Sequence, residues 1–217
     1  MTRPPDGQTI RRVGMFGGAF DPPHGAHRSL AEAAIEQLHL DVLHVLPTGQ
    51  AWHKSRPLTD AAHRVAMCGL AFGDLPRVRI DQREIHRQGP SYTADTLAEL
   101  QREYPQAELF LVLGADQLLA FRQWVRWQEV ISLATLAVAA RARSIGAQAL
   151  DAPVEEADLS GVDLPFSPLT MPLNPVSATA VRARLAAVGP DAASLDVLVP
   201  APVASYISQN HLYQTPT

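Results

Sequence analysis

One stretch of the chain is apolar at nearly every position. This stretch is ELFLVLG, residues 108–114. A second stretch with the same pattern is TLAVAAR, residues 135–141. A strand with one face in water alternates apolar and polar residues, whereas a strand buried on both faces is apolar throughout. We therefore expect an α/β fold in which helices cover both faces of a doubly wound parallel sheet.

Helix patterns alternate with strand patterns along the chain, as that fold requires. Strands are predicted at 9–18, 41–47, 78–85, 108–114 and 135–141, with a short one at 169–173. Helices are predicted at 27–40, 59–74, 91–105, 124–134, 177–189 and 200–213, the second capped by Thr59 or Asp60 and the third near Ser91 or Thr93.

We expect a single domain over residues 1–217. It would comprise a flexible leader at 1–10, an irregular surface excursion at 142–173 that is rich in proline, and a helical C-terminal part at 177–213. In a doubly wound fold, ligands bind at the carboxyl ends of the strands. The polar residues that follow the predicted strands are therefore the candidates for a site.

Charge and cysteine content exclude several classes of protein. The formal net charge is −4, so the chain lacks the basic excess typical of proteins that bind nucleic acid. Cys68 is the one cysteine, which rules out a disulfide framework, and its apolar helix predicts a buried thiol. No apolar run reaches the roughly 18 residues of a membrane span, and no signal peptide is evident. We expect a cytoplasmic protein with neither a membrane nor a nucleic-acid partner.

The segment GMFGGAFDPPHGAH, residues 14–27, is the first candidate for chemistry. Gly17 and Gly18 follow a predicted strand and would let the backbone approach a ligand closely. His24 and His27, three residues apart at a helix start, share one face, where free N–H groups and the helix dipole favour phosphate. An ordinary turn with incidental histidines explains the spacing equally well. Two histidines lack a third ligand nearby, so we predict no protein metal site here.

The end of the 108–114 strand is the second candidate. Gly114 permits close approach, and Asp116 places a carboxylate at the same edge of the sheet. Trp124, which follows, suits stacking on a flat ring, although a core position is the commoner role for such a tryptophan. Alone, this element is a weak signal, because many strands end in Gly and Asp.

The third candidate is SATAVRARL, which starts at Ser177. Ser177 has the pattern of an N-cap, Thr179 lies in the first turn, and Arg182 follows. Hydroxyl groups, free N–H groups and a guanidinium at one helix start suit a phosphate. A capped surface helix with solvated arginines is the simpler interpretation when the element is taken alone.

Together, these elements resemble the HxGH nucleotidyltransferases, and most closely the bacterial nicotinate-nucleotide adenylyltransferases. The matching segments in chain order are GGAFDPPHGAH, WHKSRPLT, HRVAM, SYTADTL, GADQLLAFRQW, VSATAVR and VASYISQNHLY, which cover roughly residues 12–213. Two departures stand out. Ala26 replaces the usual glycine of the first motif, and RARS at 141–144 replaces a common RPG.

The resemblance implies a Rossmann-like nucleotidyltransferase that converts ATP and nicotinate mononucleotide to deamido-NAD and pyrophosphate, with Mg²⁺ arriving on the ATP. The implied catalytic residues are His24, His27 and Arg182. The implied ATP-binding residues are Gly17, Gly18, Phe20, Gly114, Asp116, Ser177 and Thr179. The implied mononucleotide-binding residues are Lys54, Tyr92, Thr93, Ala94 and Trp124.

Three alternatives stay open at this point. Phosphopantetheine adenylyltransferases share the HxGH motif and a serine-threonine-arginine element like that of VSATAVR, but they are usually shorter and lack the SYTADTL and GADQ segments. A homologue that prefers the nicotinamide mononucleotide would look almost the same. A nucleotide-binding regulator could retain the pocket without catalysis, although the retention of His24, His27, Asp116 and Arg182 argues against it. The sequence leaves the oligomeric state open, a homo-oligomer included.

Overall fold

The central sheet has six strands in the order β3-β2-β1-β4-β5-β6, and every pairing is parallel. The computed structural model describes residues 9–49, 57–139, 157–172, 174–188, 195 and 198–214. The strands are Arg12–Gly18 (β1), Val42–Pro47 (β2), Val78–Ile80 (β3), Glu108–Gly114 (β4), Thr135–Ala139 (β5) and Phe166–Leu169 (β6). The doubly wound parallel sheet predicted from the apolar runs is confirmed.

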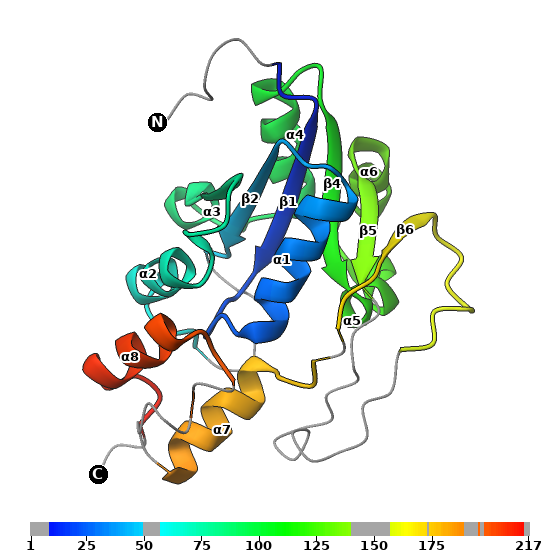
Figure 1. Cartoon of the computed structure of the whole chain (residues 1–217). Coiled ribbons are helices and arrows are strands. Elements are labelled where there is room, and N and C mark those ends of the chain that lie inside the picture. Colours follow the sequence, from blue (N-terminus) through cyan, green and yellow to red (C-terminus); the bar gives the residue numbers. More distant parts are fainter. Residues whose placement is uncertain are drawn as a thin grey trace.

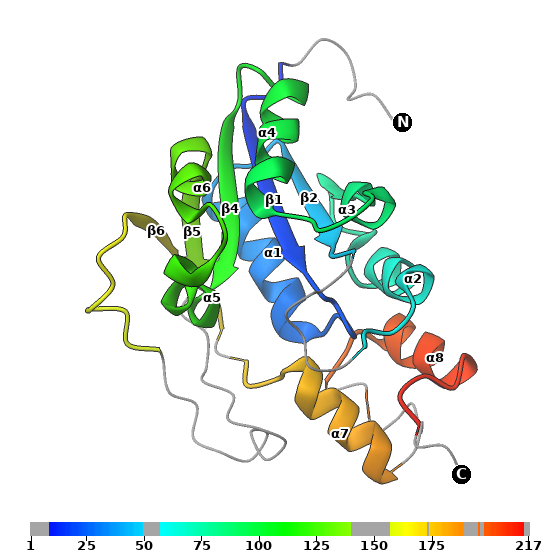
Figure 2. The same cartoon turned by 180° about the vertical axis from the view of Figure 1, so that it is seen from behind.

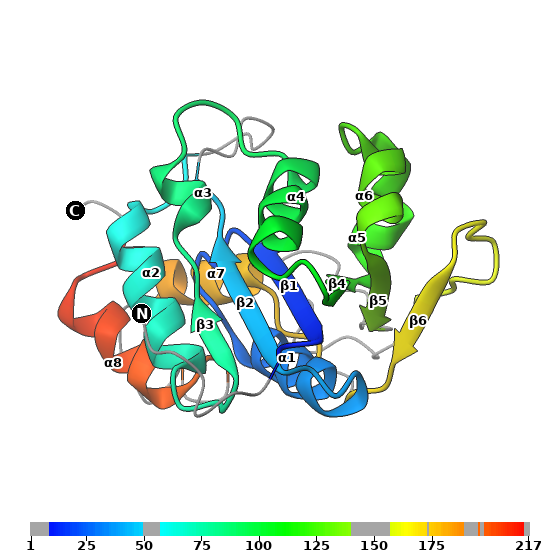
Figure 3. The same cartoon turned by 90° about the horizontal axis from the view of Figure 1, so that it is seen from above.

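Helices cover both faces of this sheet. The α-helices are Gly25–Gln37 (α1), Ala61–Phe72 (α2), Arg83–His86 (α3), Thr93–Glu103 (α4), Ala115–Leu119 (α5), Trp127–Leu133 (α6), Ala178–Val188 (α7) and Ala201–Gln209 (α8), and Phe121–Gln123 forms a 3₁₀ turn (η1). Figure 1 shows α1 in front of the sheet with α2 beside it, and Figure 2 shows α4 and α6 on the opposite face. The view from above separates the two helical layers (Figure 3).

Each face of the sheet has its own core, because neighbouring residues of a strand point to opposite faces. Phe16 of β1 packs with Met67 and Phe72 of α2, in a core that includes residues of α1, α7 and α8. Met15 packs on the other side with Leu97 of α4 and residues of α5 and α6. The helices α7 and α8 lie beyond the carboxyl ends of the strands (Figure 1). The predicted helical C-terminal part is thus present at the edge where ligands bind in such folds.

Two predicted strands differ from those observed. The strand predicted at 78–85 ends at Ile80, because Asp81 Oδ1 accepts a hydrogen bond from the Arg83 N–H at 3.0 Å and the chain turns into α3. The strand predicted at 169–173 lies earlier, at Phe166–Leu169, and interrupts the excursion predicted at 142–173. Pro168 fits there because β6 is an edge strand, where proline is tolerated.

The burial of Cys68 and the N-caps of α2 and α4 can also be compared with the sequence predictions. The fully buried position of Cys68 is confirmed, and burial raises the pKa of its thiol. Asp60 caps α2, since its Oδ1 accepts from the Ala62 N–H at 2.7 Å. The N-cap of α4 is Tyr92, which lies between Ser91 and Thr93, so the start predicted near these residues is confirmed. Among the described residues, no helix is both long and apolar enough to cross a membrane.

Candidate active site

The strand order reverses between β1 and β4, and this is where a doubly wound sheet opens a crevice for ligands. Arg12 of β1 pairs with Glu108 of β4, and each strand runs seven residues. The two strands therefore end at the same edge, at Gly18 and Gly114. The expected juxtaposition of the first and second sequence motifs is confirmed.

Phe20 explains why Gly18 is a glycine. A Cβ on Gly18 would lie 3.1 to 3.4 Å from atoms of the Phe20 ring, whereas Gly17 is exposed and a Cβ there would make only an ordinary contact with Met15 Cε at 3.9 Å. Phe20 is itself buried, with a backbone φ of 45°, and its ring packs edge-on to His27 with centroids 5.1 Å apart. The ring therefore supports His27 from the core, and only the backbone of Phe20 is available to a nucleotide.

The two motif histidines stack on each other. Their ring centroids are 3.7 Å apart with an interplanar angle of 29°. His24 is the N-cap of α1 and is 1% exposed, whereas His27 is half-buried. The His24 N–H donates to His27 Nδ1 at 3.2 Å, so the proton of a neutral His27 ring lies on Nε2. This contact fixes the orientation of the His27 ring relative to the start of α1.

The backbone at the start of α1 is less free than the sequence suggests. The Gly25 N–H donates to the Leu198 carbonyl at 3.1 Å, and the His27 N–H donates to the His24 carbonyl at 3.0 Å. Two of the N–H groups at this helix terminus therefore already have acceptors within the protein. Ala26 is buried in the first helical turn, where alanine is more favourable than glycine.

Arg182 joins the third motif to the first across 161 residues of sequence. Its Nη1 donates to the Asp21 carbonyl at 2.7 Å, and its Nη2 donates to Thr179 Oγ1 at 3.1 Å. Ser177 Oγ accepts from the Ala180 N–H at 3.2 Å, which confirms Ser177 as an N-cap. The start of α7 thus faces the loop that carries the histidines.

Asp21 is a central residue of this loop that the sequence did not single out. It is 1% exposed, its Oδ1 accepts from the Tyr213 hydroxyl at 2.7 Å, and its Oδ2 accepts from the Thr59 N–H at 3.3 Å. Burial and the Asp21 charge both raise the pKa of Tyr213, so the phenol stays a donor. Asp21 and Tyr213 both lie in quoted motifs, but nothing local in the sequence pairs them.

Arg64 is a second residue to which the sequence assigned no role. It is 2% exposed, and its guanidinium donates to the carbonyls of Ala19, Thr48 and Thr59 at 3.1, 2.8 and 2.9 Å. Burial lowers the pKa of Arg64, while the nearby Asp21 charge raises it. Arg64 therefore holds together the ends of β1 and β2 and the start of α2.

The mononucleotide residues predicted from the sequence gather on α4 and beside α6. Tyr92 caps α4, and Thr93 and Ala94 form its first turn, where N–H groups have no acceptor within the helix. Trp124 is half-buried, with its ring 5.2 Å from that of Phe121. It thus has both a core contact and an accessible part.

Arg126 links these two parts of the candidate site. It adopts the left-handed backbone conformation before α6, and its guanidinium pairs with Asp95 in the first turn of α4 and with Glu129 of α6. The loop that carries Trp124 is thereby fixed beside the turn of α4 that carries the amide groups.

Lys54 lies outside the described residues. At the carboxyl edge, Gly114 is the N-cap of α5, and Asp116 is exposed with Gln117 Nε2 donating to it at 2.9 Å. Within the described ranges, no three His, Cys, Asp or Glu side chains come close enough to hold a metal ion. Both carboxylate oxygens of Asp21 are already engaged, by Tyr213 and by the Thr59 N–H.

A cavity of about 410 Å³ lies elsewhere, at the amino ends of β4, β5 and β6. Glu108, Thr135 and Phe166 are among its lining residues. None of the predicted site residues lines it, so it is separate from the candidate active site.

Comparison with known proteins decides the family. Residues 15–184 match the family model described as cytidylyltransferase-like. The chain is 51% identical over 207 residues to a probable nicotinate-nucleotide adenylyltransferase from Albidiferax ferrireducens, covering 95% of this chain and 100% of that relative. A relative of the same description from Methylibium petroleiphilum is 43% identical over 206 residues, covering 95% and 94%. The chain belongs to the nicotinate-nucleotide adenylyltransferase family.

The fold agrees with membership of this family. Nicotinic acid mononucleotide adenylyltransferase from Plasmodium falciparum, solved in complex with APC, superposes with a TM-score of 0.75 at 17% identity, covering 94% of this chain and 97% of that one. The same enzyme solved in complex with NaAD gives a TM-score of 0.74. At this identity the likeness concerns the fold alone.

Proposed function

We propose that this enzyme transfers the adenylyl group of ATP to the phosphate of nicotinate mononucleotide, in a step of NAD biosynthesis. A phosphate oxygen of the mononucleotide attacks the α-phosphorus of ATP, the bond from that phosphorus to the bridging oxygen of the β-phosphate breaks, and pyrophosphate leaves. The products are deamido-NAD and pyrophosphate. The contact of Arg182 with the Asp21 carbonyl carries the proposal, because it brings two separated anion-binding motifs to one edge of the sheet.

The reaction needs no general base. The second pKa of a phosphate monoester is about 6, so the nucleophile is largely ionised at neutral pH. The demand on the protein is to bring two anions together and to stabilise the charge that develops on the leaving pyrophosphate. The Nε2–H group of His27, the stacked His24 and the guanidinium of Arg182 supply donors and positive charge for that purpose. Ser177 and Thr179 would contact the phosphates from the side of α7.

The two substrates would occupy neighbouring parts of the carboxyl edge. The backbone of Gly17, Gly18 and Phe20 would contact ATP, with Gly114 and Asp116 at its ribose or adenosine. Trp124 would stack on the pyridine ring, and the amides around Tyr92, Thr93 and Ala94 would bind its carboxylate. Lys54 would add a cation for the mononucleotide phosphate. Mg²⁺ would enter as part of the ATP substrate.

A pyrophosphate-release assay with ATP and each pyridine mononucleotide tests the proposal. We expect turnover with the acid form, and deamido-NAD as the product by mass spectrometry. A purified, folded protein that released no pyrophosphate with any pyridine mononucleotide would instead be a nucleotide-binding regulator. A single domain over the whole chain, a cytoplasmic location and a homo-oligomer remain proposals alongside this one.

A further inference from the structure

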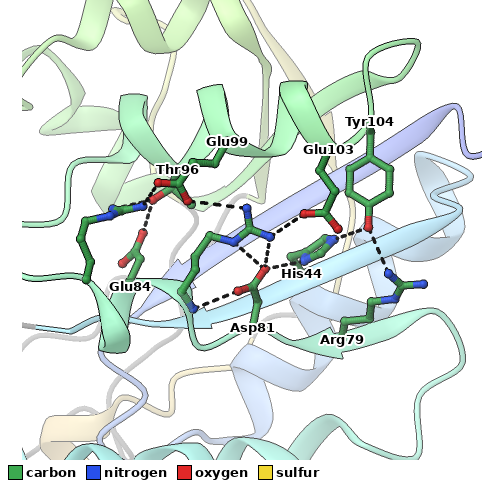
Figure 4. Close-up of polar contacts among 10 residues, drawn as sticks. His44, Arg79, Asp81, Glu84, Thr96, Glu99, Glu103 and Tyr104 are labelled. Atoms are coloured by element: carbon green, nitrogen blue, oxygen red, sulfur yellow. Dashed lines mark hydrogen bonds and ion pairs between the residues drawn. The ribbon is translucent and has the colours of Figure 1, made fainter. Parts of the chain in front are cut away.

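Glu84, on the short helix α3, is a buried acid that the proposed chemistry does not use. Its side chain is 7% exposed and points toward Thr96 on α4, at one end of a cluster of polar side chains (Figure 4). An ionisable group is costly to bury, and an apolar side chain of similar size could fill the same space at lower cost. The contacts of Glu84 show what the carboxyl group does there.

The side chain of Glu84 contacts one end of the segment 91–96. The Thr96 hydroxyl, which is fully buried, donates to Glu84 Oε1 at 2.9 Å. Arg87 Nη1 donates to the same hydroxyl oxygen at 3.1 Å, which orients its proton toward the carboxyl group. Burial raises the pKa of Glu84, while the Thr96 hydrogen bond and the Arg87 charge lower it.

The main chain of Glu84 contacts the other end of the same segment. The Ser91 hydroxyl donates to the Glu84 carbonyl at 3.3 Å. Gly49, just after β2, packs against this carbonyl so closely that a Cβ on Gly49 would collide with it. One residue therefore holds both ends of 91–96, and the turn between the two ends carries the amides of Thr93 and Ala94.

We propose that Glu84 is a positioning residue for the acid-form mononucleotide, because it fixes the first turn of α4 through Ser91 and Thr96. This inference rests on the proposed function, in which that turn binds the nicotinate carboxylate. Hydrogen bonds weaken steeply when donor and acceptor are misaligned. A displaced turn would therefore weaken binding of the acid form more than binding of ATP or of the amide form.

The test compares Thr96→Val, Glu84→Leu and Glu84→Gln by steady-state kinetics with the acid and amide mononucleotides. Thr96→Val and Glu84→Leu remove the hydrogen bond, and we expect them to raise the KM for the acid form about tenfold, with the KM for ATP within about twofold. The ratio of kcat/KM for acid over amide should fall by the same factor. Glu84→Gln keeps an acceptor oxygen for the Thr96 hydroxyl, so its ratio should stay closer to the wild-type value than that of Glu84→Leu.

Tyr104→Phe is the matched control, because it removes a hydroxyl from the far end of the same cluster, where His44 and Arg79 contact it at 3.1 Å (Figure 4). It should leave the ratio of kcat/KM for acid over amide unchanged.

The inference is wrong if Thr96→Val keeps the wild-type ratio within about twofold, or if Tyr104→Phe lowers it equally. Thr96→Val is nearly isosteric, so it carries the test if Glu84→Leu does not fold. Wild-type protein inactive with both mononucleotides would overturn the proposed function, and this inference with it.

Discussion

His27 has a fixed orientation before any ligand arrives. Its Nδ1 is occupied by the His24 N–H, and its ring packs between His24 and Phe20. Preorganised donors of this kind stabilise charge in a transition state without reorganising during the reaction. The sequence predicted the pair of histidines, but not which nitrogen of a neutral His27 ring carries the proton, because that depends on a backbone contact.

Replacement of His27 by alanine should therefore lower kcat by at least about 100-fold, as the loss of one transition-state donor typically does. Pyrophosphate release at saturating ATP and acid-form mononucleotide measures the effect. His86→Ala is the control, because His86 is exposed at the end of α3. A near-normal rate in the His27 variant would remove this residue from the catalytic set.

Gly49 packs so closely against Glu84 that the addition of one methyl group should destabilise the protein. A Cβ there would collide with the carbonyl oxygen and carbon of Glu84. Gly49→Ala should force α3 and the end of β2 apart, and we expect thermal denaturation to show a lower Tm together with a higher KM for the mononucleotide. Gly69→Ala on α2 is the control, because a Cβ at Gly69 meets no atom within 4 Å. Equal Tm values for the two variants would show that the close approach is unimportant.

At the scale of elements, the C-terminal helices close the candidate site through Asp21. Arg182 of α7 binds its carbonyl, and Tyr213, which follows α8, binds its carboxylate. Each contact joins residues more than 150 positions apart, so no sequence periodicity could have predicted it. The strand patterns, in contrast, predicted β1, β2, β4 and β5, because burial on both faces leaves a direct signature in composition.

Where the sequence prediction of elements was wrong, a local interaction explains it. Alternation continues past Ile80, but the side chain of Asp81 ends the strand by binding the Arg83 amide. Pro168 marked an irregular segment in the sequence and instead occupies an edge strand. Both errors concern the ends of the sheet, where fewer neighbours constrain the chain.

Tyr213→Phe tests the closure by the C-terminal helices. The buried carboxylate of Asp21 would lose one of its donors, and removing such a partner costs about 1 to 3 kcal/mol. We expect a lower free energy of unfolding by urea denaturation and a KM for ATP raised several-fold. Tyr206→Phe is the control on α8, because its hydroxyl contacts His63 at 3.0 Å rather than Asp21. If both variants show the same KM for ATP as wild type, the contact of Tyr213 does not shape the ATP site.

At the scale of the whole molecule, the buried cluster around Asp81 makes stability depend on pH. Burial opposes ionisation of Asp81, but hydrogen bonds from His44 and Arg83 outweigh it and hold its pKa well below the usual range. The unfolded chain therefore binds the proton more readily than the folded protein. The stabilisation by Asp81 is complete above the unfolded pKa of about 4 and is lost as the pH falls toward the folded pKa.

Asp81→Asn should accordingly destabilise the protein most near neutral pH. The difference in unfolding free energy between wild type and variant should shrink between about pH 5 and pH 3, where the wild-type carboxyl is protonated on unfolding. Urea denaturation at several pH values measures this difference. A difference that stays constant over the range would show that Asp81 is not held ionised by its partners.

In the proposed function, the carboxyl edge of this sheet binds the acid form of the mononucleotide in preference to the amide form. In the proposed function a carboxylate would present acceptors to the amides of Thr93 and Ala94, whereas a carboxamide would turn an NH₂ donor toward one of them. The most direct test is kcat/KM for nicotinate mononucleotide and for its amide, measured with ATP in the same assay. We predict a higher value for the acid form. A value at least about tenfold higher for the amide form would contradict the account.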